Sequence, residues 1–67
     1  MSARVGDNWI IIDEPAERQI FYKMPISPQY EETGESLEVH KAVFLPDQIP
    51  YIRKWLEKNG IRVRKEN

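Results

Sequence analysis

The sequence predicts a small α+β domain whose elements follow the order ββ-β-α-β. Three observations lead to this prediction: one stretch has the apolar spacing of an amphipathic helix, several short stretches are rich in strand-forming residues, and prolines and glycines separate them. The strands are expected to form a mainly antiparallel sheet of three or four strands, with the helix packed on one face. Residues 1–67 are expected to form a single domain in which residues 1–7 and 65–67 are frayed.

The first two strands are expected to form a hairpin. Residues 9–12 (WIII) are dense in strand-forming side chains. Residues 14–17 place a proline at the second position of a turn, as type I turns prefer. Residues 19–24 then form the returning strand, which Pro25 ends.

A third strand is predicted over residues 37–45, after a long connection. Lys41 interrupts its apolar face, which indicates an edge position, a bulge, or a charge that discourages further pairing. The connection spans residues 25–36 and is acidic. Such long connections are often functional or mobile.

The helix is expected over residues 47–59, with Asp47 as its N-cap. Ile49, Ile52 and Leu56 form an apolar stripe at helical spacing, and Gly60 suits the left-handed position that follows a helix.

Residues 61–64 alternate apolar and basic side chains, which predicts a short half-buried strand. A crossover through the helix would make this last strand parallel to the third. It would then lie beside either the third strand or the first, giving the order 1-2-3-4 or 4-1-2-3.

The first strand is apolar on both faces, because Trp9 and Ile11 alternate with Ile10 and Ile12. One helix covers only one face of a small sheet, so the other face needs a second cover. The 25–36 connection, a second copy of the chain or a different protein could provide it. If a partner does, the predicted protein interface consists of Ile10, Ile12, Phe21, Ile26 and Tyr30.

The size of the chain also favours association with a partner. A domain of 67 residues buries only about 60% of its unfolded surface, and small domains are usually reinforced by disulfides, metals or another chain. The chain has no cysteine and a single histidine, which excludes disulfides and thiolate zinc sites. We therefore expect a non-enzymatic interaction protein, such as an adaptor, accessory subunit or inhibitor, that binds another protein or forms a homodimer.

An alternative function follows from the distribution of charge. The net charge of −1 divides into −4 for residues 1–45 and +3 for residues 46–67. The basic C-terminal third could bind nucleic acid through the backbone phosphates, although the sequence pI near 5.8 is low for such a domain. The candidate residues are Arg53, Lys54, Lys58, Arg62, Arg64 and Lys65.

No group of residues predicts catalysis. His40 is the only histidine, and Ser36 lies about 13 Å away along an extended strand, too far for a hydrogen bond. The three glycines stand apart, so no phosphate-binding loop is predicted, and neither a metal nor a cofactor is expected. The sequence shows neither a signal-peptide pattern nor a long apolar segment, which predicts a cytoplasmic protein that does not enter a membrane.

Overall fold

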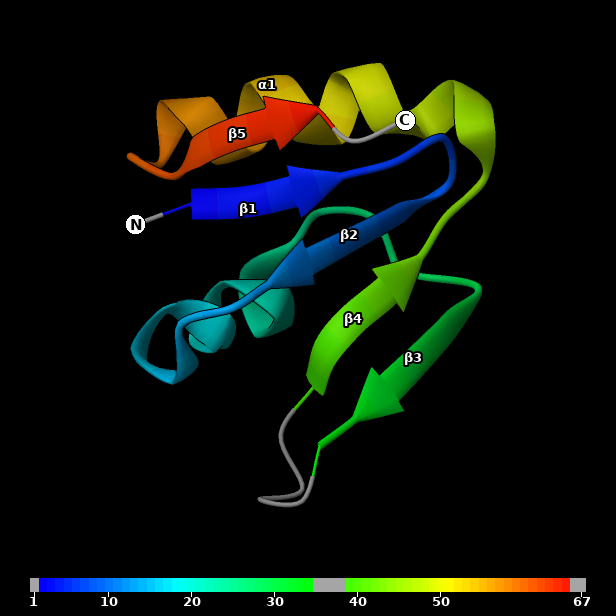
Figure 1. Cartoon of the computed structure of the whole chain (residues 1–67). Coiled ribbons are helices and arrows are strands. Elements are labelled where there is room, and N and C mark those ends of the chain that lie inside the picture. Colours follow the sequence, from blue (N-terminus) through cyan, green and yellow to red (C-terminus); the bar gives the residue numbers. More distant parts are fainter. Residues whose placement is uncertain (1, 35–38, 66–67) are drawn as a thin grey trace.

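The computed structural model describes residues 2–34 and 39–65, which form the predicted α+β fold (Figure 1). A mixed sheet holds five strands in the order β3-β4-β2-β1-β5, one more than the upper limit expected from the sequence. The strands are β1 (Ser2–Val5), β2 (Trp9–Ile12), β3 (Tyr30–Thr33), β4 (Val39–Val43) and β5 (Arg62–Lys65). The helical elements are the 3-10 helix η1 (Pro15–Lys23), the 3-10 turn η2 (Pro46–Gln48) and the α-helix α1 (Ile49–Lys58).

Ser2–Val5 form an inner strand of the sheet, so the expectation that residues 1–7 are frayed is wrong for this segment. β1 pairs with β2 in an antiparallel hairpin and with β5 in parallel. Ala3 and Val5 are buried, and the side chain of Arg4 between them points to the opposite face of the sheet. At the other end of the chain, Lys65 belongs to β5, and residues 66–67 lie outside the described residues.

The predicted strand over residues 19–24 is also wrong, because this segment belongs to η1. Arg18 donates hydrogen bonds from Nε to the carbonyl of Ile12 (2.8 Å) and from Nη2 to the carbonyl of Asp13 (2.9 Å). These bonds fasten the start of η1 to the end of β2. Ile20, Phe21 and Met24 then pack against the core at a spacing that suits a helical turn and not the two-residue repeat of a strand.

The 25–36 connection contains β3, which the sequence does not predict. β3 pairs with β4 in antiparallel fashion, so β4 is an inner strand that begins at Val39. The register between β3 and β4 shifts between Glu32 and Thr33. Of the three explanations for why Lys41 interrupts an apolar strand face, this shift confirms the bulge. Residues 35–38, including the predicted start of the third strand, lie outside the described residues.

The helix confirms the predicted stripe and the predicted end. Ile49, Ile52 and Leu56 are buried, and Gly60 has a φ of 82°. The N–H of Ile61 donates to the carbonyl of Leu56 (3.0 Å), as in a Schellman ending. The start differs from the prediction: Asp47 lies within η2, and α1 has no side-chain cap at its N-terminus.

The predicted strand orders are wrong, because β5 lies next to the unpredicted β1. The predicted direction of the last strand is confirmed: the pairings of β1, β2 and β4 make β5 run parallel to β4, the strand that precedes the helix.

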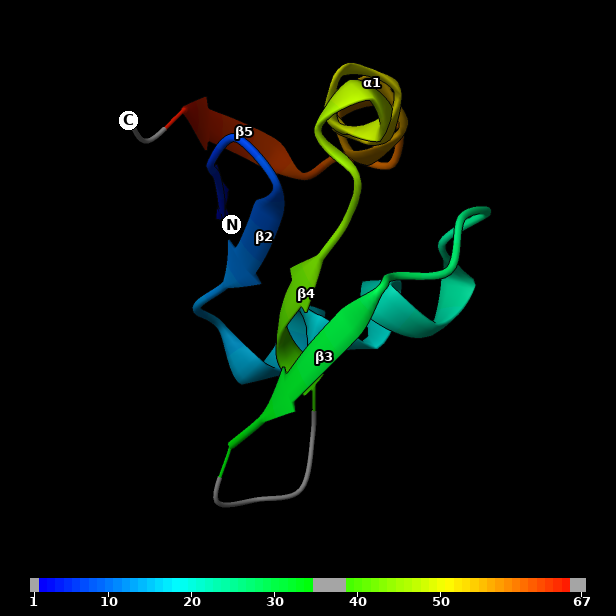
Figure 2. The same ribbon diagram turned by 90° about the vertical axis from the view of Figure 1, so that its right-hand side faces the viewer.

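The hydrophobic core lies between one face of the sheet and the helices. In Figure 1, α1 and η1 both lie behind the strands, and Figure 2 shows them on the same side of β2. The buried cluster consists of Ala3, Val5, Ile10, Ile12, Ala42, Phe44, Ile49, Ile52, Leu56 and Ile61. Two helical elements therefore share one face of the sheet.

Candidate functional site

The opposite face of the sheet, which we call the open face, is covered by no helix of the described residues (Figures 1 and 2). The strand register shows which side chains it carries, because directly paired residues point to the same face. Ile10 is buried on the covered face, and so its neighbours Trp9 and Ile11 point to the open face.

One row of side chains crosses the open face on all five strands. Successive pairings place Glu32 beside Lys41, Lys41 beside Ile11, Ile11 beside Arg4, and Arg4 beside Arg64. Three of these five side chains are basic, and we call this the basic row. Arg62 lies two residues before Arg64 on β5 and points to the same face.

A second row, the aromatic row, lies next to the basic row. Tyr30 pairs with Val43, and Val43 pairs with Trp9. Tyr30 is 58% exposed, whereas Val43 and Trp9 are half-buried. Because neighbouring residues on one face of a strand are about 6.7 Å apart, the two rows run side by side at roughly this distance.

A glycine fixes the position of the indole in the aromatic row. The ring of Trp9 lies where a Cβ of Gly6 would be, so the glycine allows the ring to lie on the backbone of the β1–β2 turn. The N–H of Gly6 donates to the carbonyl of Trp9 (2.9 Å), which closes this turn. Lys41 of the basic row stands over the same ring, with Nζ 5.8 Å from its centroid.

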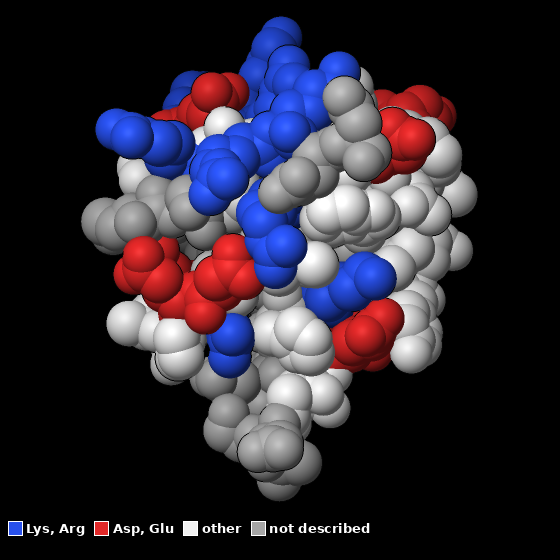
Figure 3. All heavy atoms as spheres, viewed as in Figure 1, with Lys and Arg blue, Asp and Glu red and all other residues white. Residues whose placement is uncertain are grey.

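The positive charge of the open face is unevenly neutralised. Arg4 forms a bidentate pair with Asp13 (3.0 and 2.8 Å), and Lys41 lies 3.6 Å from Glu32. Arg62 and Arg64 are exposed and form no ion pair with any residue that the structure describes. Figure 3 shows basic side chains extending from the β5 edge toward the middle of the face, with acidic groups to either side. The β5 side of the open face therefore carries an excess of positive charge.

The structure does not bring the predicted protein-interface residues together. Ile10 and Ile12 are completely buried in the core, so the expectation that they lie on the uncovered face is wrong. Phe21 and Ile26 are half-buried and pack against the same core. Tyr30 alone among the five lies on the open face and is exposed. The sequence could not separate the two faces of β2, because both carry apolar residues.

The predicted basic residues are divided between two sides of the molecule. Arg53, Lys54 and Lys58 belong to α1, on the covered side of the sheet. Arg62 and Arg64 lie on the open face. Lys65 is exposed at the edge, in register with the buried Val5, and so points to the covered side.

Sequence reasoning missed Arg4, Lys41 and Trp9 as members of a functional surface. The signal for Arg4 was present, because Ala3, Arg4 and Val5 alternate small apolar and basic residues just as residues 61–64 do. The signal for Lys41 was its interruption of an apolar strand face.

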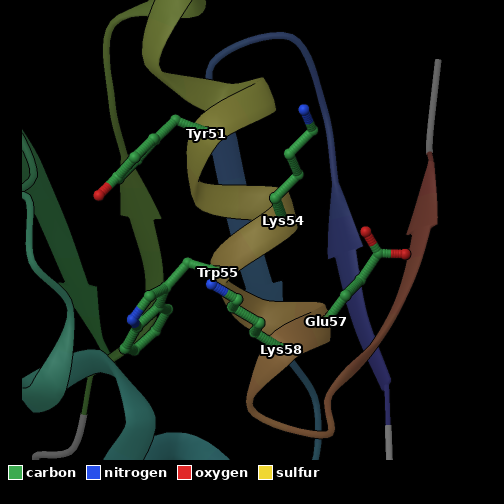
Figure 4. Close-up of a pocket in the computed structure, with 5 residues that line it drawn as sticks. All are labelled: Tyr51, Lys54, Trp55, Glu57 and Lys58. Atoms are coloured by element: carbon green, nitrogen blue, oxygen red, sulfur yellow. The ribbon is translucent and has the colours of Figure 1, made fainter.

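A groove of about 440 Å³ lies along α1, on the covered side (Figure 4). Tyr51 and Trp55 point to one side of the helix, and Glu57 points to the other. Lys54 and Lys58 complete its lining. Since all five residues belong to one helix, the groove is a depression in the surface of α1 and not a cleft between elements.

Among the residues that the structure describes, no hydrogen-bond partner is found for three buried polar atoms: Nδ1 of His40 and both carboxylate oxygens of Glu17. The described residues contain no group of three or more potential metal ligands. No described helix has the length and the apolar character needed to cross a membrane.

The chain matches no protein-family model, and comparisons with curated proteins and with solved structures gave no match. Its function is therefore inferred from the geometry of the open face.

Proposed function

We propose that this chain binds single-stranded nucleic acid across the open face of its sheet. The observation that carries the proposal is the basic row running beside the aromatic row on a face that no described helix covers. Proteins that bind single strands combine positive groups along the backbone with aromatic rings on which bases stack. The spacing of the two rows is comparable to the separation of phosphate and base within a nucleotide.

The shape of the face favours a single strand over a duplex. The sheet is broad, and Tyr30 is its most accessible aromatic side chain. A base can stack on such a ring only when it is unpaired and turned outward. Sequence-specific proteins that read duplex DNA instead place a helix or a two-stranded ribbon in a groove.

The size of the face favours nucleic acid over a large protein partner. Five strands span about 19 Å at a spacing of about 4.8 Å, and four residues of a strand span about 13 Å. These two spans correspond to an area of about 250 Å², well below the ~800 Å² that each partner buries in a standard protein interface.

The overall net charge of −1 is compatible with this proposal, because local charge steers a ligand. Arg62 and Arg64 form no ion pair with a described residue, and they share the β5 edge with Lys65. We expect phosphates to contact this edge first, while the bases reach toward Trp9 and Tyr30.

The test is fluorescence anisotropy of a labelled pyrimidine oligonucleotide and of its duplex, titrated at two salt concentrations. The full chain should bind the single strand more tightly than the duplex. The affinity should fall with salt at a slope of about −0.7 per neutralised phosphate. Arg62→Ala/Arg64→Ala should lower the steepness of this slope by about 1.4. Lys54→Ala/Lys58→Ala, a matched basic pair on α1, should leave the slope unchanged.

Two tyrosines provide a second matched comparison. Tyr30→Ala should cost about 1–3 kcal/mol of binding free energy, because it removes a stacking surface. Tyr22→Ala should have no effect, since Tyr22 is 67% exposed on η1, away from the open face. The proposal is overturned if neither oligonucleotide binds at low salt. It is also overturned if the double substitution on α1 lowers the steepness of the salt slope as much as the double substitution on β5.

A further inference from the structure

Within residues 2–34 and 39–65, each of the two outermost strands of the sheet has one side without a strand partner. β3 and β5 are the first and last strands in the order β3-β4-β2-β1-β5. An edge strand presents backbone N–H and C=O groups that can pair with a strand of another chain. The side chains of these edges therefore decide whether copies of this chain repel or attract each other.

The two edges carry opposite charge at corresponding positions. The basic row begins with Glu32 on β3 and ends with Arg64 on β5. A corresponding row of paired residues on the covered face begins with Glu31 on β3 and ends with Lys65 on β5. This second row consists of Glu31, Ala42, Ile10, Val5 and Lys65. On each face, a carboxylate thus stands at one end of a row and a cation at the other.

The directions of the strands permit a continuous sheet. β3 is antiparallel to β4, and β5 has the same direction as β4, so β3 and β5 run in opposite directions. A second copy in the same orientation would place its β3 antiparallel to β5 of the first. If the rows continue across this junction, Arg64 faces Glu32 of the next copy and Lys65 faces its Glu31.

The exposure of these residues leaves the junction accessible. Glu31, Arg64 and Lys65 are exposed. The side chain of Glu32 is 41% exposed, although Lys41 lies 3.6 Å from it. η1 packs against β2 and β4, and Figure 2 shows β3 standing clear of α1.

Charged edge strands usually prevent association, because copies with like charges on their edges repel each other. Here the two edges carry opposite charges, so the same residues attract a second copy at either edge. Repulsion between copies would prevent association only if β3 and β5 carried charge of the same sign.

We propose that copies of this chain associate through their sheet edges, with β5 of one copy pairing with β3 of the next. The contact is heterologous, so it adds copies in a row and does not stop at a two-fold dimer. It differs from the dimer expected from the sequence, which would bury a sheet face. The proposal does not rest on nucleic-acid binding.

The experiment is sedimentation velocity on the full chain, without nucleic acid, from micromolar to millimolar concentration. The weight-average mass should rise with concentration at about 50 mM salt and fall back toward the monomer at about 500 mM, because salt screens exposed charges. A monomer at every concentration at low salt would overturn the proposal.

Charge reversal makes the test specific. Glu31→Lys/Glu32→Lys gives two basic edges, and Arg64→Glu/Lys65→Glu gives two acidic edges. Each variant alone should remain monomeric, and a mixture of the two should associate again. Lys54→Glu/Lys58→Glu, which reverses two charges on α1, should associate like the unchanged chain. Failure of the mixture to associate, or association of either variant alone, would contradict the proposed junction.

Circular dichroism checks that each variant is folded. Glu31→Lys and Lys65→Glu provide milder single changes at exposed positions if a double variant does not fold. Each should reduce association of its own solution, and their mixture should recover part of it. An equal mass for all single variants would overturn the proposal.

Discussion

Lys41 contacts two groups on the open face: its Nζ stands 5.8 Å from the centroid of the Trp9 ring and 3.6 Å from Oε2 of Glu32. The aromatic row and the basic row therefore meet at this lysine. A base that stacks on Trp9 has to move the ammonium group aside, and a phosphate close by would attract the same group away from Glu32. If the chain binds nucleic acid as proposed, Lys41 would change its contacts when a strand binds.

Lys41→Met keeps most of the length of the side chain but removes its charge. Nucleic-acid binding should weaken by about tenfold or less, and the salt slope should fall by about 0.7, because one phosphate contact is lost. Anisotropy at two salt concentrations measures both effects. An unchanged slope would show that Lys41 does not contact a phosphate.

Gly6→Ala should destabilise the fold by about 1–3 kcal/mol, because the new Cβ would occupy the position of the Trp9 ring. Urea unfolding measures this loss. In the Trp9→Leu background the same glycine substitution should cost much less, since the smaller side chain leaves room. Equal costs in both backgrounds would place the strain elsewhere.

Ile10→Asp and Ile11→Asp form an adjacent pair on opposite faces of β2. Ile10 is completely buried, so a carboxylate there should cost more than about 4 kcal/mol and prevent folding. Ile11 is half-buried on the open face, and its substitution should cost at most about 1–2 kcal/mol. Circular dichroism separates the two outcomes, and a folded Ile10→Asp chain would contradict the assignment of faces.

Gly60→Ala should cost about 1–2 kcal/mol, because Gly60 has a φ of 82° at the end of α1. Gly34→Ala provides the control: its Cβ would lie 3.6 Å from Nδ1 of His40, an ordinary contact distance. Thermal unfolding should show a clear shift for the first substitution and little for the second. Equal shifts would mean that the backbone conformation at Gly60 is not the cause.

Asp13→Asn should cost less than about 1 kcal/mol, even though Arg4 contacts both oxygens of Asp13. The side chains of this pair are 36% and 52% exposed, so water and salt screen the attraction. Urea unfolding should show a small difference at low salt and a smaller one at high salt, because salt screens the pair. A loss above about 2 kcal/mol would show that the pair organises the turn between β2 and η1.

The sequence was sufficient to predict the elements whose structure depends on interactions between residues close together in the chain. The stripe of Ile49, Ile52 and Leu56 and the ending at Gly60 predicted α1, because a helix depends on neighbours three and four residues apart. Trp9–Ile12 was predicted as a strand from its residue types alone.

Long-range contacts decided the remainder of the fold. β1 has only four residues, and its parallel partner β5 lies near the other end of the chain. The segment around Phe21 has strand-forming residues, yet the hydrogen bonds of Arg18 and the packing on the core make it helical. Tertiary packing thus overrides local preference.

The candidate site was only partly predictable for the same reason. Arg62 and Arg64 are candidates from the sequence because of the positive charge of residues 46–67, and their alternation with Ile61 and Val63 predicts that they lie on a strand. Their grouping with Arg4 and Trp9 depends on the pairing of β5 with β1 and of β1 with β2. Neither pairing can be derived from the local sequence.

The parallel pairing of β1 with β5 also affects how the chain acquires its structure during synthesis. β1 precedes β5 in the chain, so the outer side of β1 has no strand partner until residues 62–65 have been synthesised. Until then, the hairpin of β1 and β2 exposes the backbone groups on the outer side of β1 to water or to other chains. Completion of the sheet therefore requires β5, whose pairing with β1 closes a loop over residues 6–61.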